Sequence, residues 1–154
     1  MDHVVSRAHV EAFYRAYAAR DAEKVAPFLH DDIEWTINGP VDYLPFCGTH
    51  RGKANVLDLI RTRVPAVLRV VGFVADAMLV DGDSTAILSR QSSRRTSDNQ
   101  AISYRVANFM RFQDGQVIEN LSLIDSFDAV EQVLGQQLVS PGRIRAGNGE
   151  FVVV

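Results

Sequence analysis

Hydrophobic and polar residues alternate along residues 69–125, and this alternation predicts a meander of four antiparallel strands. Turn-forming residues divide the meander at residues 81–82, 97–99 and 114–115, and the last pair, Asp-Gly, is a strong hairpin signal. Pairing outward from these turns sets Arg90 opposite Val106 and Tyr104 opposite Asp125. The three turns therefore predict which side chains share a face.

One face of this predicted sheet combines apolar residues with a few polar groups. Because side chains alternate along a strand, Arg90, Tyr104, Asn108 and Asp125 are expected on this face. A hydrophobic lining with sparse polar groups is typical of a ligand cavity. The opposite face, which includes Phe109, is expected to be too apolar for water and too polar for a core. It predicts a homodimer through the outer face of the sheet.

Apolar positions spaced by three and four residues predict helices before and after the meander. Helices are expected over 4–19, 22–29, 53–63 and 128–138, a strand over 33–37, and an irregular loop over 41–50. This order predicts an α+β fold: a cone-shaped α+β barrel with N-terminal helices packed on the concave face of a curved, mostly antiparallel sheet. We expect one pocket-forming domain over 1–139 and a C-terminal tail over 140–154.

The composition restricts which binding partners and which cellular compartment we expect. The net charge is −3 and basic residues are dispersed, which predicts no nucleic-acid partner. The absence of a long apolar run predicts no membrane association. Cys47 is the single cysteine, which excludes an internal disulfide and favours a cytoplasmic protein. No pair of histidines or cysteines has metal-ligand spacing, so we expect no metal and no cofactor.

Five short segments carry a family resemblance. They read RDAEKV (20–25), LHDDI (29–33), CGTHRGKA (47–54), VDGD (80–83) and FMRFQDGQV (109–117). In this order they resemble the nuclear-transport-factor-two-like domains, which include steroid Δ-isomerases, SnoaL-like polyketide cyclases and limonene-epoxide hydrolases. The resemblance implies the cone-shaped fold, but that fold carries many activities as well as plain binding roles.

The steroid-isomerase resemblance implies a carboxylate base, a tyrosine and a protonated acid. The base falls near Ile37 or Asn38, neither of which can take a proton. The tyrosine falls on Phe13, and the acid falls on Asn108, whose amide can still donate a hydrogen bond. This comparison disfavours the steroid-isomerase mechanism.

The epoxide-hydrolase resemblance implies an Asp–Arg–Asp set that activates a water molecule. Arg90 falls on the arginine and Asp125 on one carboxylate, but Ser92 occupies the place of the second. The incomplete set disfavours that chemistry. The cyclases often need a single carboxylate beside a large apolar pocket, and Asp125 could serve there.

These arguments yield one candidate site. Its catalytic residues are Asp125 and Arg90, and its ligand-binding residues are Tyr14, Tyr17, Trp35, His50, Tyr104 and Asn108. Asp125 is either a general base or half of a structural ion pair with Arg90. Tyr104 and Asn108 are either hydrogen-bond donors to a ligand or satisfied core residues.

The sequence predicts a small-molecule pocket protein. Its partner is a small apolar or carbonyl-bearing ligand, and acid–base catalysis of the lyase, isomerase, cyclase or hydrolase kind would act on a largely apolar carbonyl or carboxylate compound. The alternative is a non-catalytic ligand-binding or protein-assembly module with the same fold.

Overall fold

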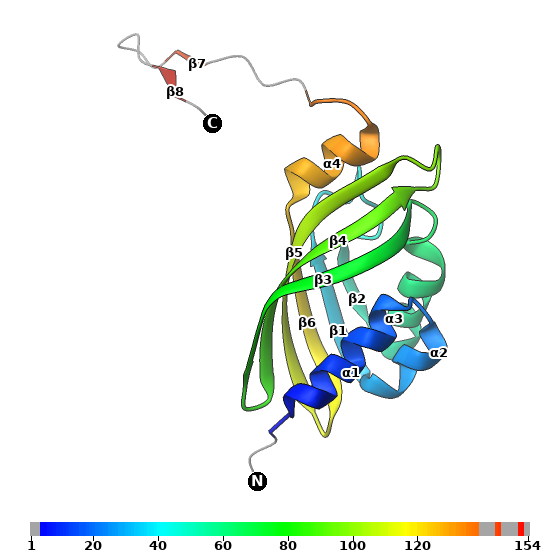
Figure 1. Ribbon diagram of the computed structural model, residues 1–154, viewed down its shortest axis with the longest axis vertical. Helices are drawn as coiled ribbons and strands as arrows, with labels where there is room; N and C mark the ends of the chain where they lie inside the picture. Colours follow the sequence, from blue (N-terminus) through cyan, green and yellow to red (C-terminus); the bar gives the residue numbers. More distant parts are fainter. Residues whose placement is uncertain (1–3, 139–143, 146–150, 153–154) are drawn as a thin grey trace.

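A computed structural model describes residues 4–138, 144–145 and 151–152, and its body is a six-stranded sheet with helices against one face (Figure 1). The helices are α1 (Arg7–Ala18), α2 (Ala22–Val25), the 3-10 helix η1 (Ala26–Phe28), α3 (Lys53–Asp58), the π-helix η2 (Leu59–Arg63) and α4 (Ser126–Leu134). The strands are β1 (Leu29–Asn38), β2 (Gly48–Arg51), β3 (Leu68–Asp81), β4 (Ser84–Arg95), β5 (Ala101–Gln113), β6 (Gln116–Ile124), β7 (Ile144–Arg145) and β8 (Phe151–Val152).

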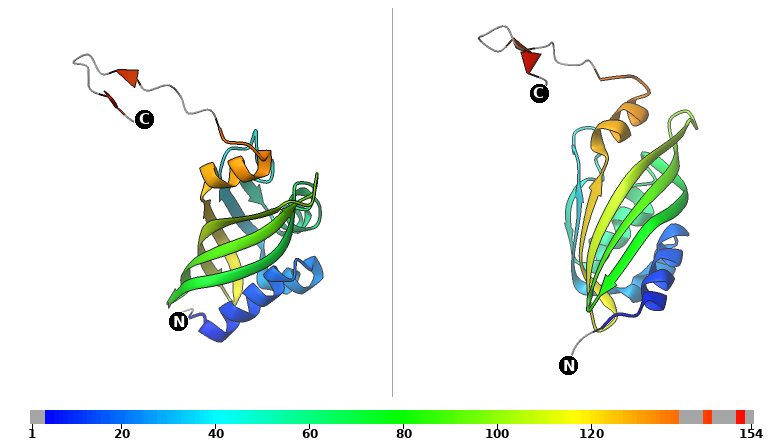
Figure 2. Two further views of the ribbon diagram at one scale, coloured as in Figure 1. Left: turned by 45° about the horizontal axis from the view of Figure 1, so that its top comes forward. Right: turned by 60° about the vertical axis from the view of Figure 1, so that its left-hand side comes forward.

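The strand order of the main sheet is β2-β1-β6-β5-β4-β3, and only the β1–β6 pair is parallel. The three views agree that α1, α2 and α3 cover one face, while α4 lies at the end of the sheet near β5 (Figures 1 and 2). The predicted α+β architecture, with helices on the concave face of a curved and mostly antiparallel sheet, is therefore confirmed. Of the expected tail over 140–154, residues 140–143, 146–150 and 153–154 lie outside the described residues.

Capping side chains set where the first two helices begin. Ser6 Oγ accepts a hydrogen bond from the backbone N–H of His9 at 3.1 Å, and Asp21 accepts one from Glu23 at 3.0 Å. The second helix continues through Pro27 as the 3-10 turn η1, because proline tolerates a helix start but cannot donate within one.

Two strands differ from the expected pattern. β1 spans ten residues rather than five, and β2 overlaps the end of the stretch 41–50 that was predicted to be an irregular loop. β2 pairs with β1 in an antiparallel register that sets His50 opposite Trp35. A four-residue strand is too short for its alternation to be distinguished from a loop.

The hairpin between β5 and β6 begins in the predicted register and then departs from it. Gln113 lies opposite Gln116 as expected. A β-bulge near the turn then shifts β6 by one residue, so Asn108 lies opposite Ser122 rather than Leu121. Because the side-chain period of a strand is two, this slip turns every later residue of β6 to the other face.

The turn between β4 and β5 also closes one residue from its predicted place. The backbone N–H of Arg95, rather than Thr96, bonds to the carbonyl of Gln100 at 2.9 Å. Gln91 consequently lies opposite Tyr104, where Ser92 was expected. The predicted faces of β4 are therefore exchanged, whereas those of β5 are correct.

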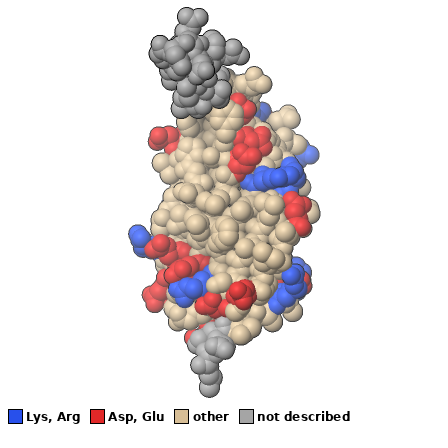
Figure 3. Space-filling model, turned by 90° about the vertical axis from the view of Figure 1, so that its left-hand side faces the viewer, with Lys and Arg blue, Asp and Glu red and all other residues tan. Residues whose placement is uncertain are grey.

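The two faces of the sheet differ in an unusual way. The concave face buries an apolar core together with polar side chains of Ser89, Gln91, Ser93, Asn108, Asn120 and Ser122. The outer face carries a convex apolar patch, which we define as Ala86, Leu88, Ala107, Phe109, Leu121 and Leu123. Leu88, Phe109, Leu121 and Leu123 are 39–49% exposed. Figure 3 views the molecule from this side and shows a broad uncharged area across its middle.

No helix within the described part of the chain is long and apolar enough to span a membrane.

Candidate functional site

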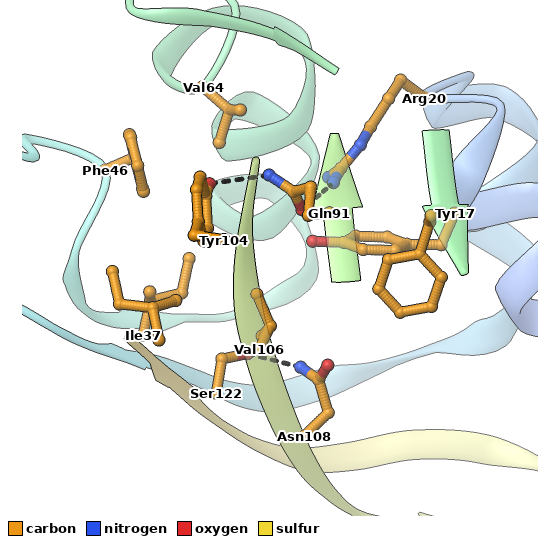
Figure 4. A pocket seen from close by; sticks show the side chains of 12 residues that line it. Tyr17, Arg20, Ile37, Phe46, Val64, Gln91, Tyr104, Val106, Asn108 and Ser122 are labelled. Atoms are coloured by element: carbon orange, nitrogen blue, oxygen red, sulfur yellow. Dashed lines mark hydrogen bonds between the residues drawn. The ribbon is translucent and has the colours of Figure 1, made fainter. Parts of the chain in front are cut away.

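The candidate site is a small cavity between the concave face of the sheet and the helices (Figure 4). Its wall is formed by Tyr17, Arg20, Ile37, Phe46, Val64, Phe73, Gln91, Tyr104, Val106, Asn108, Ser122 and Ile124. The centres of water-sized molecules can occupy about 30 Å³ of it, which is room for about two waters. A ligand larger than a few atoms therefore requires side chains of the wall to move.

The polar groups of the wall form a chain that begins at a cation. Arg20 Nη2 donates to Gln91 Oε1 at 3.0 Å, and Gln91 Nε2 donates to the Tyr104 hydroxyl at 2.7 Å (Figure 4). A guanidinium has only donors, so it must face the amide oxygen of Gln91. The orientation of the Gln91 amide is thereby fixed by the charge of Arg20.

The hydrogen bonds from Arg20 through Gln91 to Tyr104 leave the hydroxyl proton of Tyr104 free for another acceptor. The Tyr104 oxygen accepts from Gln91, and none of the described residues accepts the tyrosine's own proton. Burial raises the pKa of Tyr104, so the hydroxyl stays protonated through the neutral range. The wall thus presents a neutral hydrogen-bond donor to the cavity.

Arg20 is held at the cavity by an unusual backbone and by an aromatic ring. It follows the end of α1 with φ of 52°, a conformation in which glycine is the usual residue. Its guanidinium carbon lies 4.1 Å from the centre of the Tyr17 ring, close enough for a cation–π interaction. Its Nε is buried without a hydrogen-bond partner. The protein therefore provides hydrogen-bond acceptors for only some of the N–H groups of Arg20.

A second polar group lies on β5 and β6. Ser122 Oγ accepts from Asn108 Nδ2 at 2.6 Å and from Asn120 Nδ2 at 2.9 Å. Both of these hydrogen bonds come from amides, so the Ser122 hydroxyl retains its own proton for donation. Asn108 and Ser122 line the cavity, which gives this part of the wall a second donor.

Asp125 and Arg90 do not lie at the cavity, and their predicted placement is wrong. Both are exposed: Arg90 lies on the outer face of β4, and Asp125 lies just past the end of β6. The slip of β6 turns Asp125 away from Tyr104, and the shifted turn moves Arg90 opposite Arg105 instead of Val106. Asp125 instead occupies the N-cap position of α4, where its side chain makes no capping hydrogen bond.

Three of the eight predicted site residues line the cavity: Tyr17, Tyr104 and Asn108. Tyr14 is buried nearby, where its hydroxyl donates to Met110 Sδ at 3.9 Å and its ring stacks on Phe73. A ligand-binding role for Tyr14 thus stays a prediction without support from the cavity wall.

Trp35 and His50 lie in the core beside the cavity. Trp35 is 1% exposed and packs against the rings of Phe13 and Tyr17. His50 was expected in a rim loop, but it lies on β2 and is 6% exposed. Its Nε2 lies 3.0 Å from the carbonyl oxygen of Phe46, a residue of the wall. His50 therefore positions the wall and does not contact the cavity.

Sequence reasoning missed Arg20 and Gln91. Gln91 was assigned to the outer face by the incorrect register of β4. Arg20 was interpreted as the end of the first helix and as part of the family segment 20–25, and the three-residue spacing from Tyr17 was the one available signal of a cation–π contact.

No carboxylate lies among the described residues of the wall, and Arg20 is its one charged group. Nor do any three His, Cys, Asp or Glu residues in the described part of the chain cluster so that they could hold a metal ion. The chemistry that this wall supports is hydrogen-bond donation to an acceptor from Tyr104 and Ser122, next to a positive charge.

A family model described as a SnoaL-like domain matches residues 10–120. The chain belongs to the SnoaL-like family. A putative isomerase from Rhodopseudomonas palustris is 33% identical to this SnoaL-like protein, with a TM-score of 0.78 over 86% of this chain and 100% of that one.

More distant structures share the fold. A nuclear-transport-factor-two-like protein of unknown function from Burkholderia pseudomallei is 20% identical, with a TM-score of 0.74 over 82% of this chain and 95% of that one. A protein described as an LEH-like epoxide hydrolase from M. tuberculosis is 19% identical, with a TM-score of 0.66 over 83% of this chain and 88% of that one. A comparison with curated proteins gave no significant match.

Proposed function

We propose that this SnoaL-like protein binds a small, largely apolar molecule through a carbonyl or carboxylate oxygen, which the Tyr104 hydroxyl polarises. The observation that carries the proposal is the free proton of Tyr104, directed by the Arg20–Gln91 pair. A donor fixed in a dry site stabilises developing negative charge on oxygen more strongly than water does. Apolar wall residues, such as Val106, accommodate the remainder of the ligand.

Acetone is a suitable probe because it is a neutral carbonyl compound with only four heavy atoms, so it demands little movement of the wall. Four heavy atoms bind with at most about −6 kcal/mol, so we expect a dissociation constant in the millimolar range. Titration of ¹⁵N-labelled protein with acetone should shift the amide signals of Tyr104, Val106 and Ser122. Shifts confined to other regions would contradict the proposal.

Tyr104→Phe is the decisive variant, and Tyr43→Phe is its matched control. The first removes the hydroxyl at the cavity, while Tyr43 is 50% exposed elsewhere. We expect Tyr104→Phe to weaken acetone binding about tenfold, the value of one hydrogen bond. Tyr43→Phe should bind as the wild type does. Equal affinity in all three proteins would contradict a role for Tyr104.

A second candidate function is isomerisation of a carbonyl compound. The 33% identity to the protein described as a putative isomerase favours it, and a hydrogen-bond donor at the carbonyl oxygen is one part that such chemistry requires. The described wall residues supply no carboxylate base. Recovery of a bound ketone with exchanged α-hydrogens in D₂O would favour the enzyme, and recovery without exchange would favour a binding role.

We also propose that two copies pair through the convex apolar patch. Two rows of three residues form it across β4, β5 and β6: Leu88, Ala107 and Leu123 in one row and Ala86, Phe109 and Leu121 in the next. Contiguous exposed apolar surface of this kind is typical of an interaction site. A twofold pairing would bury each patch against its copy.

A further inference from the structure

The charge of the cavity distinguishes between the two ligand classes, carbonyl and carboxylate, that the proposed function allows. A neutral carbonyl needs only a donor such as Tyr104, yet the wall also contains Arg20. No described carboxylate lies within ion-pair distance of Arg20. The cation is half-buried, so its charge is only partly solvated. A partly buried charge without a counterion is costly, which favours an anion as its missing partner.

The backbone supports a functional role for this arginine. Arg20 occupies a left-handed position at which glycine would avoid the steric cost. Strain of this kind persists where the surroundings over-determine the conformation, and it is common at ligand sites. The Tyr17 ring and the Gln91 amide hold the guanidinium in place. Arg20 therefore meets a ligand in a fixed orientation rather than as a mobile surface cation.

The remaining guanidinium donors match a carboxylate. Arg20 uses one N–H of Nη2 for Gln91, which leaves the other N–H of Nη2 and both of Nη1 unassigned. Carboxylates accept two parallel hydrogen bonds from such a fork. Tyr104 lies at the far end of the hydrogen-bonded chain that runs from Arg20 through Gln91, so both groups can reach one bound molecule.

Resting on the proposed function, we infer that the natural ligand is a small carboxylate, and that Arg20 selects it over neutral compounds of the same shape. One carboxylate oxygen accepts from the Arg20 guanidinium, while Tyr104 donates to an acceptor oxygen of the same ligand. The apolar wall residues receive the rest of the molecule.

Acetate and acetamide test this inference because they share a shape and differ in charge. Both are titrated into the labelled protein at neutral pH and constant ionic strength, and the affinity ratio of the two is the readout. We expect the wild type to prefer acetate about tenfold or more, as a charge-assisted hydrogen-bonded pair would give. A ratio near one in the wild type would overturn the inference.

Two variants of Arg20 test whether this residue causes the preference for acetate over acetamide. Arg20→Met should bring the ratio close to one, because it weakens the binding of acetate more than the binding of acetamide. Arg20→Lys, which keeps the charge without the fork, should give an intermediate ratio. Arg15→Met is the matched control, because it removes the same charge from an exposed position on α1 outside the cavity wall, and it should keep the wild-type ratio.

The ratio of acetate affinity to acetamide affinity distinguishes a failure of this inference from a failure of the proposed function. If Arg20→Met lowers overall affinity but still prefers acetate, Arg20 does not select the anion and the inference is wrong, while the pocket stands. If acetone binds at Tyr104 but acetate is not preferred, the inference again fails and the proposed function stands. If acetone, acetate and acetamide all leave the cavity signals unmoved, both proposals are wrong.

Discussion

Neighbouring residues of β5 show how differently the two faces of the sheet are built. Asn108 faces the concave side, is 6% exposed, and donates to Ser122. Phe109 faces outward and is 49% exposed. A monomeric domain usually places these two side-chain types the other way round. The concave face therefore keeps polar groups at an energetic cost, and the outer face keeps apolar groups that a partner would cover.

The largest effect is expected from a charge on the concave face. Asn108→Asp buries a carboxylate between Asn120 and Ser122, and we expect it to lower the free energy of unfolding by about 3 kcal/mol at neutral pH. Burial raises the pKa of the new carboxyl above its unfolded value. The decrease in the free energy of unfolding should therefore have its full size at neutral pH and become smaller as the pH falls toward about 4. Urea denaturation at several pH values measures this.

Ser92→Asp is the matched control for that variant. It adds the same charge at an exposed position of β4 on the outer face. We expect a change within about 0.5 kcal/mol and little dependence on pH. Equal losses in the two variants would show that the faces do not differ as described.

The next effect is the alkylation rate of Cys47, which measures whether a reagent in solution can reach the concave side of the sheet. Cys47 is 5% exposed, and burial raises the pKa of its thiol from 9.0 to about 11. Because the thiolate is the nucleophile, alkylation near pH 8 should be about a hundredfold slower than in the unfolded chain. The folded state binds the thiol proton of Cys47 more tightly than the unfolded chain does. The free energy of unfolding should therefore fall as the pH rises from about 9 toward 11.

An engineered thiol on the outer face completes that comparison. Ser92→Cys in a Cys47→Ser background should react with iodoacetamide at the rate of a free thiol, because Ser92 is exposed. Comparable rates at the two positions would mean that the cavity side is open to the reagent.

A smaller effect is expected from the convex apolar patch. Phe109→Asp introduces a charge at its centre, and we expect it to weaken self-association by about 2 kcal/mol or roughly thirtyfold. Sedimentation equilibrium over a range of concentrations measures this. Asn99→Asp, at an exposed turn remote from the patch, should associate as the wild type does. A wild type that stays monomeric would refute the pairing of copies.

The sequence allowed the fold to be predicted more fully than the site. Periodicity predicted the helices and the four-strand meander, because α1 buries residues at helical spacing and β5 buries every second residue. The inward direction of Tyr104 and Asn108 was also predicted, since β5 was correctly phased. Gln91 and Asp125 were placed on the wrong faces because a bulge and a four-residue loop each moved the pairing by one residue. Such slips leave the strands intact but exchange the side chains that reach the cavity.

The free hydroxyl proton of Tyr104 is the central claim, and vibrational spectroscopy of a bound carbonyl tests it most directly. The infrared stretch of carbonyl-¹³C acetone is recorded with the wild type and with Tyr104→Phe, and the free probe is subtracted. We predict a lower stretching frequency for acetone bound to the wild type, because donation from Tyr104 weakens the C=O bond. Identical frequencies in the two proteins would contradict the account.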